Sequence, residues 1–348
     1  MIECCCEHRH KRACSRDDIG DETYDVMKTR FEKEHTRVDF PFSYLKVTTN
    51  EDGSTTLELF KHYKFSRLYS HLRYVDMDAK GNMVRRRFIS AWFCDHTHRV
   101  VSSVVVDLKG EKAGIYNAWS GFRAARLDPS TYFLDVQDAM GFVVSPIIRH
   151  LNELIGCKER ANWILDWFAN IVQRPWQKTQ VAIFLLGLQE YDLLTWIRQC
   201  VLGDAHTLRT ANPKRDLFGR FSDAFANRVL VHIDNVKNLQ SHDCVLNGAI
   251  TNSTTNWELR RGPNVQAPNI SNFILTASDE SVFKISSDSR RFAVFRCSPV
   301  HDETLAKHLQ LPGVDAWFFD FLMQRDLCKY SYSFQNSLSS SITSAPRA

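Results

Sequence analysis

The sequence Val-Ala-Ile-Phe-Leu-Leu-Gly at residues 181–187 is a continuous apolar run that ends on a glycine. A run without polar alternation suits a strand that is buried on both faces, as in a parallel sheet. Apolar residues then recur at helical spacing, at Leu193, Trp196, Ile197, Cys200 and Val201. Gly203 follows where a helix cap belongs. The sequence therefore predicts a strand, a glycine loop and a helix in succession.

Further elements of the same kind are predicted on either side of this stretch. Apolar residues at helical spacing predict a helix over 161–172, which Pro175 ends. Short apolar runs predict strands at 229–233, 273–276 and 292–295. Strands that alternate with helices are typical of a largely parallel sheet with crossover helices. An aromatic, helix-like stretch over residues 315–328 completes this part of the chain.

The N-terminal part is expected to be mixed in structure. Residues 54–60 alternate like a strand, and the β-branched run 100–107 also predicts one. We expect a disordered tail over 1–20, an N-terminal region over 21–130, an α/β core over 131–330 and a disordered, serine-rich tail over 331–348.

Composition limits the classes of protein that fit. The 348 residues are 44% hydrophobic, which suffices for a packed core, and the net charge of +4 is too small to argue for nucleic acid by itself. No apolar run approaches the ~20 residues of a membrane span. Ten cysteines without regular spacing indicate a reducing, intracellular compartment, cytoplasm or nucleus.

The first residues raise the question of a zinc site. Cys4, Cys5 and Cys6 are followed by His8, His10 and Cys14. Structural zinc sites present ligands in pairs with a short gap, whereas three adjacent cysteines point their side chains apart. A frayed tail is the interpretation we favour.

Four positions in chain order fit the handling of a nucleotide. A glycine loop between strand and helix is where phosphate is held, and here that loop begins at Gly187. A second strand ends at Asp234, where an ATPase holds Mg²⁺. A third strand ends at Ser278, a small polar residue that can orient water. Arg291 stands where an arginine from a neighbouring subunit can neutralise charge.

Several longer stretches resemble one family in order and spacing. They are Met-Lys-Thr-Arg-Phe-Glu-Lys-Glu-His at 27–35, Tyr-Asn-Ala-Trp-Ser-Gly-Phe at 116–122, Trp-Phe-Ala-Asn-Ile-Val-Gln at 167–173 with Pro175 and Lys178-Thr179, Gly-Arg-Phe at 219–221, and Leu-Met-Gln-Arg-Asp-Leu at 322–327. From about Tyr24 to Cys328 the chain thus resembles the superfamily 3 helicase module of poxvirus-like primase-helicases and phage primase-polymerases. The resemblance implies an α/β fold with a P-loop NTPase (AAA+-like) core of mostly parallel strands.

The resemblance also implies ATP and Mg²⁺ as cofactors, but the phosphate loop departs from the family pattern. Family members have Gly-x-Gln-Gly-x-Gly-Lys-[Gly/Ser]-Thr. This chain reads Gly187-Leu188-Gln189-Glu190-Tyr191-Asp192-Leu193-Leu194-Thr195, so Gly187, Gln189 and Thr195 remain, while two glycines have become acidic and the lysine has become Leu193. Two carboxylates would repel phosphate, and Leu193 supplies no cation. We therefore predict a defective nucleotide site.

The remaining site residues depart less. The family's Asp-Glu is Asp234-Asn235 here, so an aspartate can still approach Mg²⁺, while Asn235 cannot act as a general base. Ser278 replaces an asparagine, and Arg291 is the better finger candidate of the pair Arg290-Arg291. His232, within an apolar strand, is interpreted as a core residue.

Two basic segments are candidates for DNA contact. Arg260 and Arg261 lie in the interval where related helicases project a hairpin into the ring channel, and a plain turn with exposed arginines explains them equally well. Arg85, Arg86 and Arg87 are interpreted as a solvated face.

By resemblance, the chain is expected to be a helicase-domain protein like the ATP-dependent DNA helicase module of viral replicative proteins, deficient in ATPase activity, with DNA and a homo-oligomeric ring as partners and no membrane. Alternatives are a helicase with unusual phosphate chemistry, a non-catalytic pseudo-helicase that binds DNA or a partner, and a relic of an integrated viral gene.

Overall fold

The computed structural model describes residues 22–50, 55–110, 113–131, 136–188, 192–217, 228–236, 243–257, 265–278, 291–298, 303–328 and 330. The expected tails, and with them the cysteine and histidine cluster of residues 4–14, lie outside these ranges. The chain divides into two compact units, and the boundary lies between Ser120 and Gly121. No helix among the described residues is long and apolar enough to cross a membrane.

The first unit contains helices and mainly antiparallel strands, so the predicted mixed N-terminal region is confirmed. Its elements are α1 (Tyr24–Phe31), β1 (His35–Val38), β2 (Ser43–Thr49), β3 (Thr55–Phe60), α2 (His62–Leu68), β4 (Arg73–Met77), β5 (Met83–Arg87), α3 (Phe88–Cys94), β6 (Val100–Val101), β7 (Val104–Val105) and β8 (Tyr116–Asn117). Four strands form a sheet in the order β3-β2-β1-β6, while β4-β5 and β7-β8 pair separately.

Aromatic rings form the core of this unit. Phe31 has ring contacts with Phe65, Phe88 and Trp92 at centroid distances of 5.1–6.0 Å. These four side chains are buried and come from α1, α2 and α3. Edge-to-face contacts of this kind are favourable beyond the area they bury. The three helices therefore pack through one aromatic cluster.

One strand prediction in this unit is wrong. The run 100–107 forms two short strands, because β6 pairs with β1 while β7 pairs with β8. Ser102 lies between them, and both its backbone N–H (2.7 Å) and its hydroxyl (2.9 Å) donate to the Gly114 carbonyl. The chain changes from one sheet to the other at this residue. The strand predicted at 54–60 is confirmed as β3.

The second unit is an α/β core around a five-stranded, all-parallel sheet in the order β10-β11-β14-β9-β15. Its elements are η1 (Ala124–Arg126), η2 (Pro129–Thr131), α4 (Val136–Ile155), α5 (Lys158–Gln173), β9 (Ala182–Leu186), α6 (Asp192–Trp196), a π-helical segment η3 (Ile197–Leu202), η4 (Asp204–His206), β10 (Thr207–Thr210), α7 (Pro213–Asp216), β11 (Leu230–Ile233), α8 (Asp243–Thr251), β12 (Thr254–Trp257), β13 (Val265–Pro268), β14 (Asn272–Ala277), β15 (Phe292–Arg296), α9 (Glu303–His308) and α10 (Val314–Gln324). The predicted parallel sheet is confirmed.

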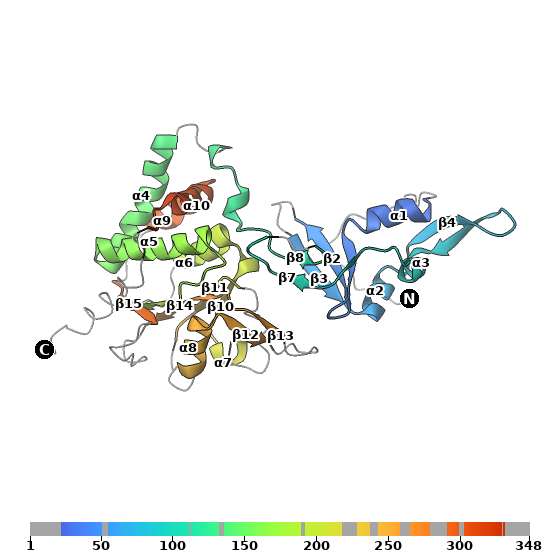
Figure 1. Cartoon of the computed structure of the whole chain (residues 1–348). Coiled ribbons are helices and arrows are strands. Elements are labelled where there is room, and N and C mark those ends of the chain that lie inside the picture. The colour runs from blue at the N-terminus through green and yellow to red at the C-terminus, as the bar shows by residue number, and fades with distance from the viewer. Residues whose placement is uncertain are drawn as a thin grey trace, which may run out of the picture. The chain divides into compact units, whose positions relative to one another are not determined.

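The sheet lies between two layers of helices (Figure 1), with α4, α5 and α10 on one side and α8 on the other. All five residues of β9 are buried. Ile183 and Leu185 contact the α4–α5 side, whereas Phe184 belongs to the core that includes Leu246 of α8. Both faces of β9 are thus covered, which explains its unbroken apolar sequence.

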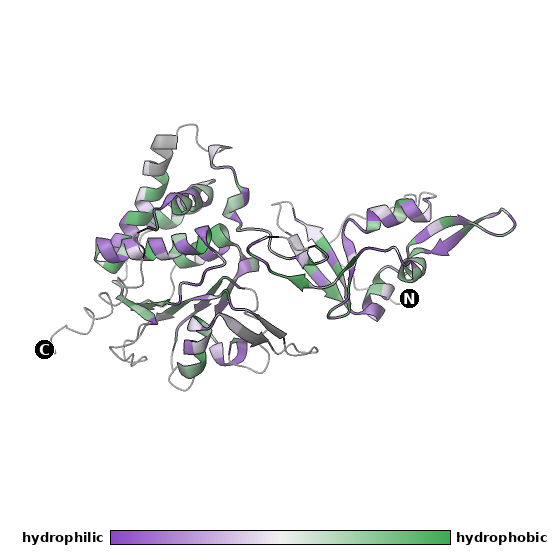
Figure 2. Cartoon of the chain, in the orientation of Figure 1, coloured by the Kyte–Doolittle hydropathy of each residue, from purple (hydrophilic) through white to green (hydrophobic). Residues whose placement is uncertain are grey.

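Helix α5 is the helix predicted at 161–172, longer at both ends, and it ends at Gln173, two residues before Pro175. Figure 2 shows hydrophobic and hydrophilic residues interleaved along it, as an amphipathic helix requires. Its Trp167 is fully buried and donates its indole N–H to the Val181 carbonyl at 2.9 Å, which attaches the helix to the start of β9.

Lys178 has a structural position at the opposite end of β9 from the glycine loop. Its ammonium donates to the carbonyl of Ala249 at 2.6 Å and of Asn252 at 3.4 Å, at the C-terminal end of α8. A cation at this end of a helix is favourable. Burial lowers the pKa of Lys178 to about 7.

Candidate functional site

The carboxyl ends of β9, β11 and β14 meet at one edge of the parallel sheet. The strand register places Leu186 opposite Ala277 and Ile233 opposite Leu275. Gly187, Asp234 and Ser278, the residues that follow these strands, therefore lie along this edge, and the structure brings these three predicted site residues together.

Gly187 has a conformation and a neighbour that only glycine tolerates. Its φ is +91°, and a Cβ atom there would lie 2.8 Å from the carbonyl oxygen of Cys297, just past the end of β15. Its N–H donates to the Ala277 carbonyl at 2.8 Å. The close approach of two strand ends thus accounts for this glycine without a bound phosphate.

Asp234 is a buried carboxylate with partners on both oxygens. Arg209 of β10 donates to Oδ2 from Nε at 3.0 Å and from Nη2 at 2.5 Å. The hydroxyl of Thr276 donates to Oδ1 at 3.0 Å. A guanidinium that donates through two nitrogens is a strong carboxylate partner. Arg209 was not among the residues that the sequence predicted for the site.

Thr276 connects three groups at this edge. Its Oγ1 also lies 3.3 Å from the Asn235 N–H and 3.1 Å from Nε2 of His232. A hydroxyl has one proton, and here it is donated to Asp234, so both nitrogens donate to the hydroxyl oxygen. His232 is therefore the tautomer with its proton on Nε2.

His232 is buried, as predicted, although only one of its ring nitrogens is satisfied. Among the described residues Nδ1 has no hydrogen-bond partner. Burial lowers the pKa of His232 to about 4, against the opposing effect of Asp234. The ring is neutral at pH 7, and it acts as a hydrogen-bond donor within the core.

Asn235 has the left-handed conformation, with φ of +47°. Asparagine is one of the few residues other than glycine that adopt it readily. This backbone turn directs the Asn235 N–H toward Thr276, at the end of the neighbouring strand. An asparagine at this position thus has a structural role in the backbone turn, separate from the general-base role that it cannot perform.

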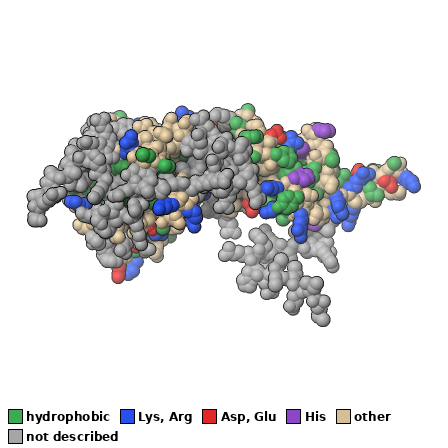
Figure 3. Space-filling model, turned by 90° about the horizontal axis from the view of Figure 1, so that it is seen from below, with side chains coloured by type: hydrophobic (Ala, Val, Ile, Leu, Met, Phe, Trp, Pro, Cys, Tyr) green, Lys and Arg blue, Asp and Glu red, His purple; other side chains and the backbone are tan. Residues whose placement is uncertain are grey.

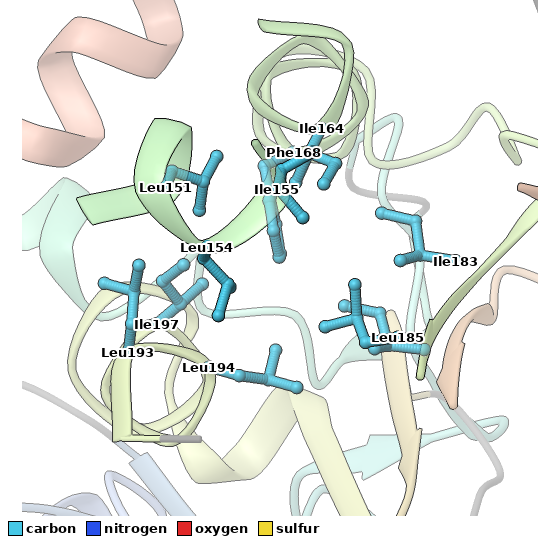
Figure 4. Close-up of a pocket in the computed structure, with 11 residues that line it drawn as sticks. Leu151, Leu154, Ile155, Ile164, Phe168, Ile183, Leu185, Leu193, Leu194 and Ile197 are labelled. Atoms are coloured by element: carbon cyan, nitrogen blue, oxygen red, sulfur yellow. The ribbon is translucent and has the colours of Figure 1, made fainter. Parts of the chain in front are cut away.

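Leu193, at the position of the family's phosphate-binding lysine, is a core residue. It is 1% exposed and lines a cavity of about 20 Å³ between α4, α5, α6 and β9. Figure 4 shows Leu193 beside Ile197, with Leu151 and Leu154 of α4 facing it. All eleven lining residues are apolar, so the helical stripe predicted from sequence is confirmed at this position.

Other predicted residues are placed differently. Asp192 is exposed and Thr195 is half-buried, both on α6. Gln189, Glu190, Arg260, Arg261 and Arg290 lie outside the described residues.

Arg291 lies at the amino end of β15, the opposite edge of the sheet from Asp234. Its carbonyl accepts from the Ala182 N–H at 2.8 Å, at the start of β9. Within one chain it is therefore not part of the edge that contains Gly187. Arg296, paired in register with Leu186, is the β15 arginine at that edge. Its place at this edge is not evident from the sequence, because strand direction and register decide which end of β15 approaches the loop.

These contacts leave little room for Mg²⁺ and ATP. A cation at Oδ2 of Asp234 would have to displace the Arg209 guanidinium, and Leu193 presents a buried methyl group where a phosphate needs an ammonium. The described residues of this edge therefore do not fit the cofactor pair. Among the described residues no group of three or more His, Cys, Asp or Glu side chains is arranged to hold a metal ion.

Comparison with known proteins shows the fold. No family model matches the chain. No curated protein matches its sequence. The A form apo structure of the NrS-1 C-terminal region matches with a TM-score of 0.62 at 14% identity over 92% of this chain and 74% of that chain. The apo structure of the NrS-1 C-terminal region matches with a TM-score of 0.61 at 16% identity and the same coverage. The class is thus an α/β protein with a P-loop NTPase-like core, and its fold is similar to that of the NrS-1 C-terminal region.

Proposed function

We propose that this chain is a helicase-like protein of the viral or phage primase-polymerase type that binds nucleic acid and does not hydrolyse ATP. The fold, the order of the sequence motifs and the arrangement of the sheet edge support the helicase-like part. The single observation that carries the loss of ATPase activity is the pairing of Asp234 with Arg209, at 2.5 Å and 3.0 Å.

The pairing matters because Asp234 is the one acidic residue retained at the position for Mg²⁺. Its side chain is 10% exposed, and the arginine already neutralises it. Divalent cations are held by carboxylate oxygens that are available for coordination. An aspartate whose oxygens are engaged by Arg209 and Thr276 is a poor ligand for a cation. Removal of the arginine would leave the buried carboxylate charge without its partner.

Leu193 supports the proposal independently. Lysine at this position of a working loop reaches the phosphates as a point charge. Here the side chain points into an apolar layer, so the helix that follows the loop is fixed through its hydrophobic face. The position contributes to the core and not to anion binding.

Assembly into a ring is part of the proposal. Arg291 lies at the edge of the sheet opposite Asp234. An arginine so placed can approach the edge that contains Asp234 only when it comes from a neighbouring copy of the chain. Mass measurement in solution at several concentrations tests this part, with a closed oligomer expected in the presence of DNA.

The test of the central claim is calorimetric titration of the full chain with ATP and Mg²⁺. We expect no binding up to millimolar ATP. Micromolar binding, about −8 kcal/mol, would overturn the claim and make a working helicase the better reading. Parallel titration with labelled single-stranded and double-stranded DNA at low salt tests the other half, and absence of binding to both would remove nucleic acid as the partner.

A further inference from the structure

The β4–β5 hairpin of the first unit has two faces of different character. Residues directly opposite each other in an antiparallel pair point to the same side. The register pairs Arg73 with Arg87, Val75 with Arg85 and Met77 with Met83, so these six residues share one face. We call it the arginine face.

The opposite face contacts the unit's core at one residue and carries an exposed ion pair beyond it. Tyr74 on this side is buried and contacts Tyr24 edge-to-face at 5.3 Å. Arg86, opposite Tyr74, forms an ion pair with Asp76 at 2.9 Å. Arg86 therefore has a carboxylate partner on its own face of the hairpin.

The arginine face is exposed. Arg85 and Arg87 are exposed, and the two methionines beyond them, Met77 and Met83, are 70% and 69% exposed. Figure 3 shows Lys and Arg side chains gathered on and beside this hairpin. Two exposed arginines and two large exposed apolar side chains thus share one surface of the hairpin, while Arg73 on the same face is half-buried.

This arrangement costs the folded protein energy. Like charges directly opposite each other across two strands are destabilising, and Arg73 stands directly opposite Arg87. Arg73 is held in place, because its Nη1 donates to the carbonyls of Ser70 at 2.6 Å and Leu72 at 3.0 Å. A ligand with regularly spaced negative charges would reverse the sign of this interaction.

We propose that the arginine face binds the phosphate backbone of nucleic acid, an inference that rests on the proposed function and assigns it a surface. The Cα atoms of Arg85 and Arg87 lie about 7 Å apart along the strand, a distance comparable with the separation of successive phosphates in a nucleic-acid strand. Guanidinium groups match phosphate geometry through two donors. Met77 and Met83 extend the surface with apolar groups that can contact sugars and base faces.

The assignment also separates the three arginines that follow one another in the sequence. Arg85 and Arg87 lie on the arginine face and contact phosphate, whereas Arg86 lies on the opposite face beside Asp76. Arg86 therefore serves as a matched control, because it has the same side chain in the same strand on the other face.

The experiment measures binding of the full chain to a fluorescent single-stranded oligonucleotide by anisotropy, between 50 and 200 mM salt. We expect Arg85→Ala/Arg87→Ala to weaken binding about tenfold or more. The slope of log K against log salt should fall by about 1.4, the value for two phosphate contacts on a single strand. Arg86→Ala should bind within about twofold of the parent chain. Arg85→Lys/Arg87→Lys should restore most of the salt slope, because it restores the charge.

The outcomes separate this inference from the proposed function. If the parent chain binds and Arg85→Ala/Arg87→Ala binds equally well, the arginine face is not the contact surface, while the proposed function stands. If the parent chain binds no nucleic acid, both fail. Binding of polyglutamate or anionic lipid vesicles, lost in the double variant while DNA binding is retained, would assign the face to another partner and overturn the inference. Unchanged thermal melting of the variants shows that lost binding is not lost folding.

Discussion

Arg209 and Asp234 form a two-nitrogen ion pair between adjacent parallel strands, with Nη2 at 2.5 Å and Nε at 3.0 Å from Oδ2. Register explains the contact. Arg209 lies opposite His232, and Asp234 is two residues beyond His232 along the same side of the neighbouring strand. The side chain of Arg209 needs to extend only along the strand to reach the carboxylate.

The ion pair predicts a coupled effect on stability. Asp234 is buried, so Arg209→Ala leaves a buried carboxylate without its main partner. We expect a loss of about 2–4 kcal/mol in the free energy of unfolding. Asp234→Asn in the Arg209→Ala background should recover part of that loss. Urea denaturation of the two single variants and the double variant measures the coupling, and strictly additive losses would contradict the pairing.

Leu193 predicts that restoring the family lysine fails for a structural reason. Leu193→Lys places an ammonium in an apolar layer, and we expect it to lower the free energy of unfolding by about 2–4 kcal/mol without creating ATP binding. Leu193→Met, similar in volume and apolar, should cost less than about 1.5 kcal/mol. Thermal unfolding and calorimetry measure both effects. Full ATPase recovery from the lysine variant would refute the placement of Leu193 in the core.

Thr276 predicts a difference between two conservative changes. Thr276→Val removes the hydroxyl that contacts Asp234, Asn235 and His232, leaving buried polar groups unsatisfied, at a cost of about 2–4 kcal/mol. Thr276→Ser keeps the hydroxyl and loses one methyl group, at a cost of about 1 kcal/mol. Chemical denaturation distinguishes them, and equal losses would show that the hydroxyl contributes nothing beyond its volume.

The buried histidines predict loss of stability in mild acid. Burial lowers the pKa of both His206 and His232 from 6.5 to about 4. The unfolded chain therefore binds protons at higher pH than the folded chain. Stability is fully present above pH 6.5 and is lost as the pH falls toward 4, by up to about 1.4 kcal/mol per pH unit for each histidine.

Urea midpoints at pH 7, 6 and 5 test this dependence before most carboxylates begin to protonate. His206→Gln should flatten the pH dependence, whereas His71→Gln, at an exposed histidine, should leave it unchanged. A midpoint that stays constant from pH 7 to pH 5 in the parent chain would show that these histidines protonate as easily in the folded state.

The sheet was predictable to the extent that its strands carry their own signal. β9, β11, β14 and β15 are short apolar runs, and burial on both faces requires such runs. β10 was not predicted, because it is the outermost strand of the sheet and its sequence, Thr-Leu-Arg-Thr, is largely polar. The strand 100–107 was predicted as one element, because β-branched residues favour strands and do not reveal that Ser102 directs the chain into another sheet.

The candidate site was predictable in position and not in its contacts. Chain order placed Gly187, Asp234 and Ser278 after successive strands, and parallel strands bring such residues to one edge. The partner of Asp234 depended on β10, on its direction and on its register, none of which a single sequence reveals. Leu193 belongs both to the phosphate loop pattern and to the helical stripe, and only packing shows that the stripe decides its environment.

The position of β9 in the sheet affects how the chain is made. β9 emerges from the ribosome before either of its neighbours, since β14 and β15 are synthesised roughly 100 residues later, after about 5–20 s. During that interval a strand that is apolar on both sides has no sheet to join. Late-arriving neighbours slow folding and favour misassociation. Translation speed and chaperone access over this interval are thus expected to set the yield of folded protein.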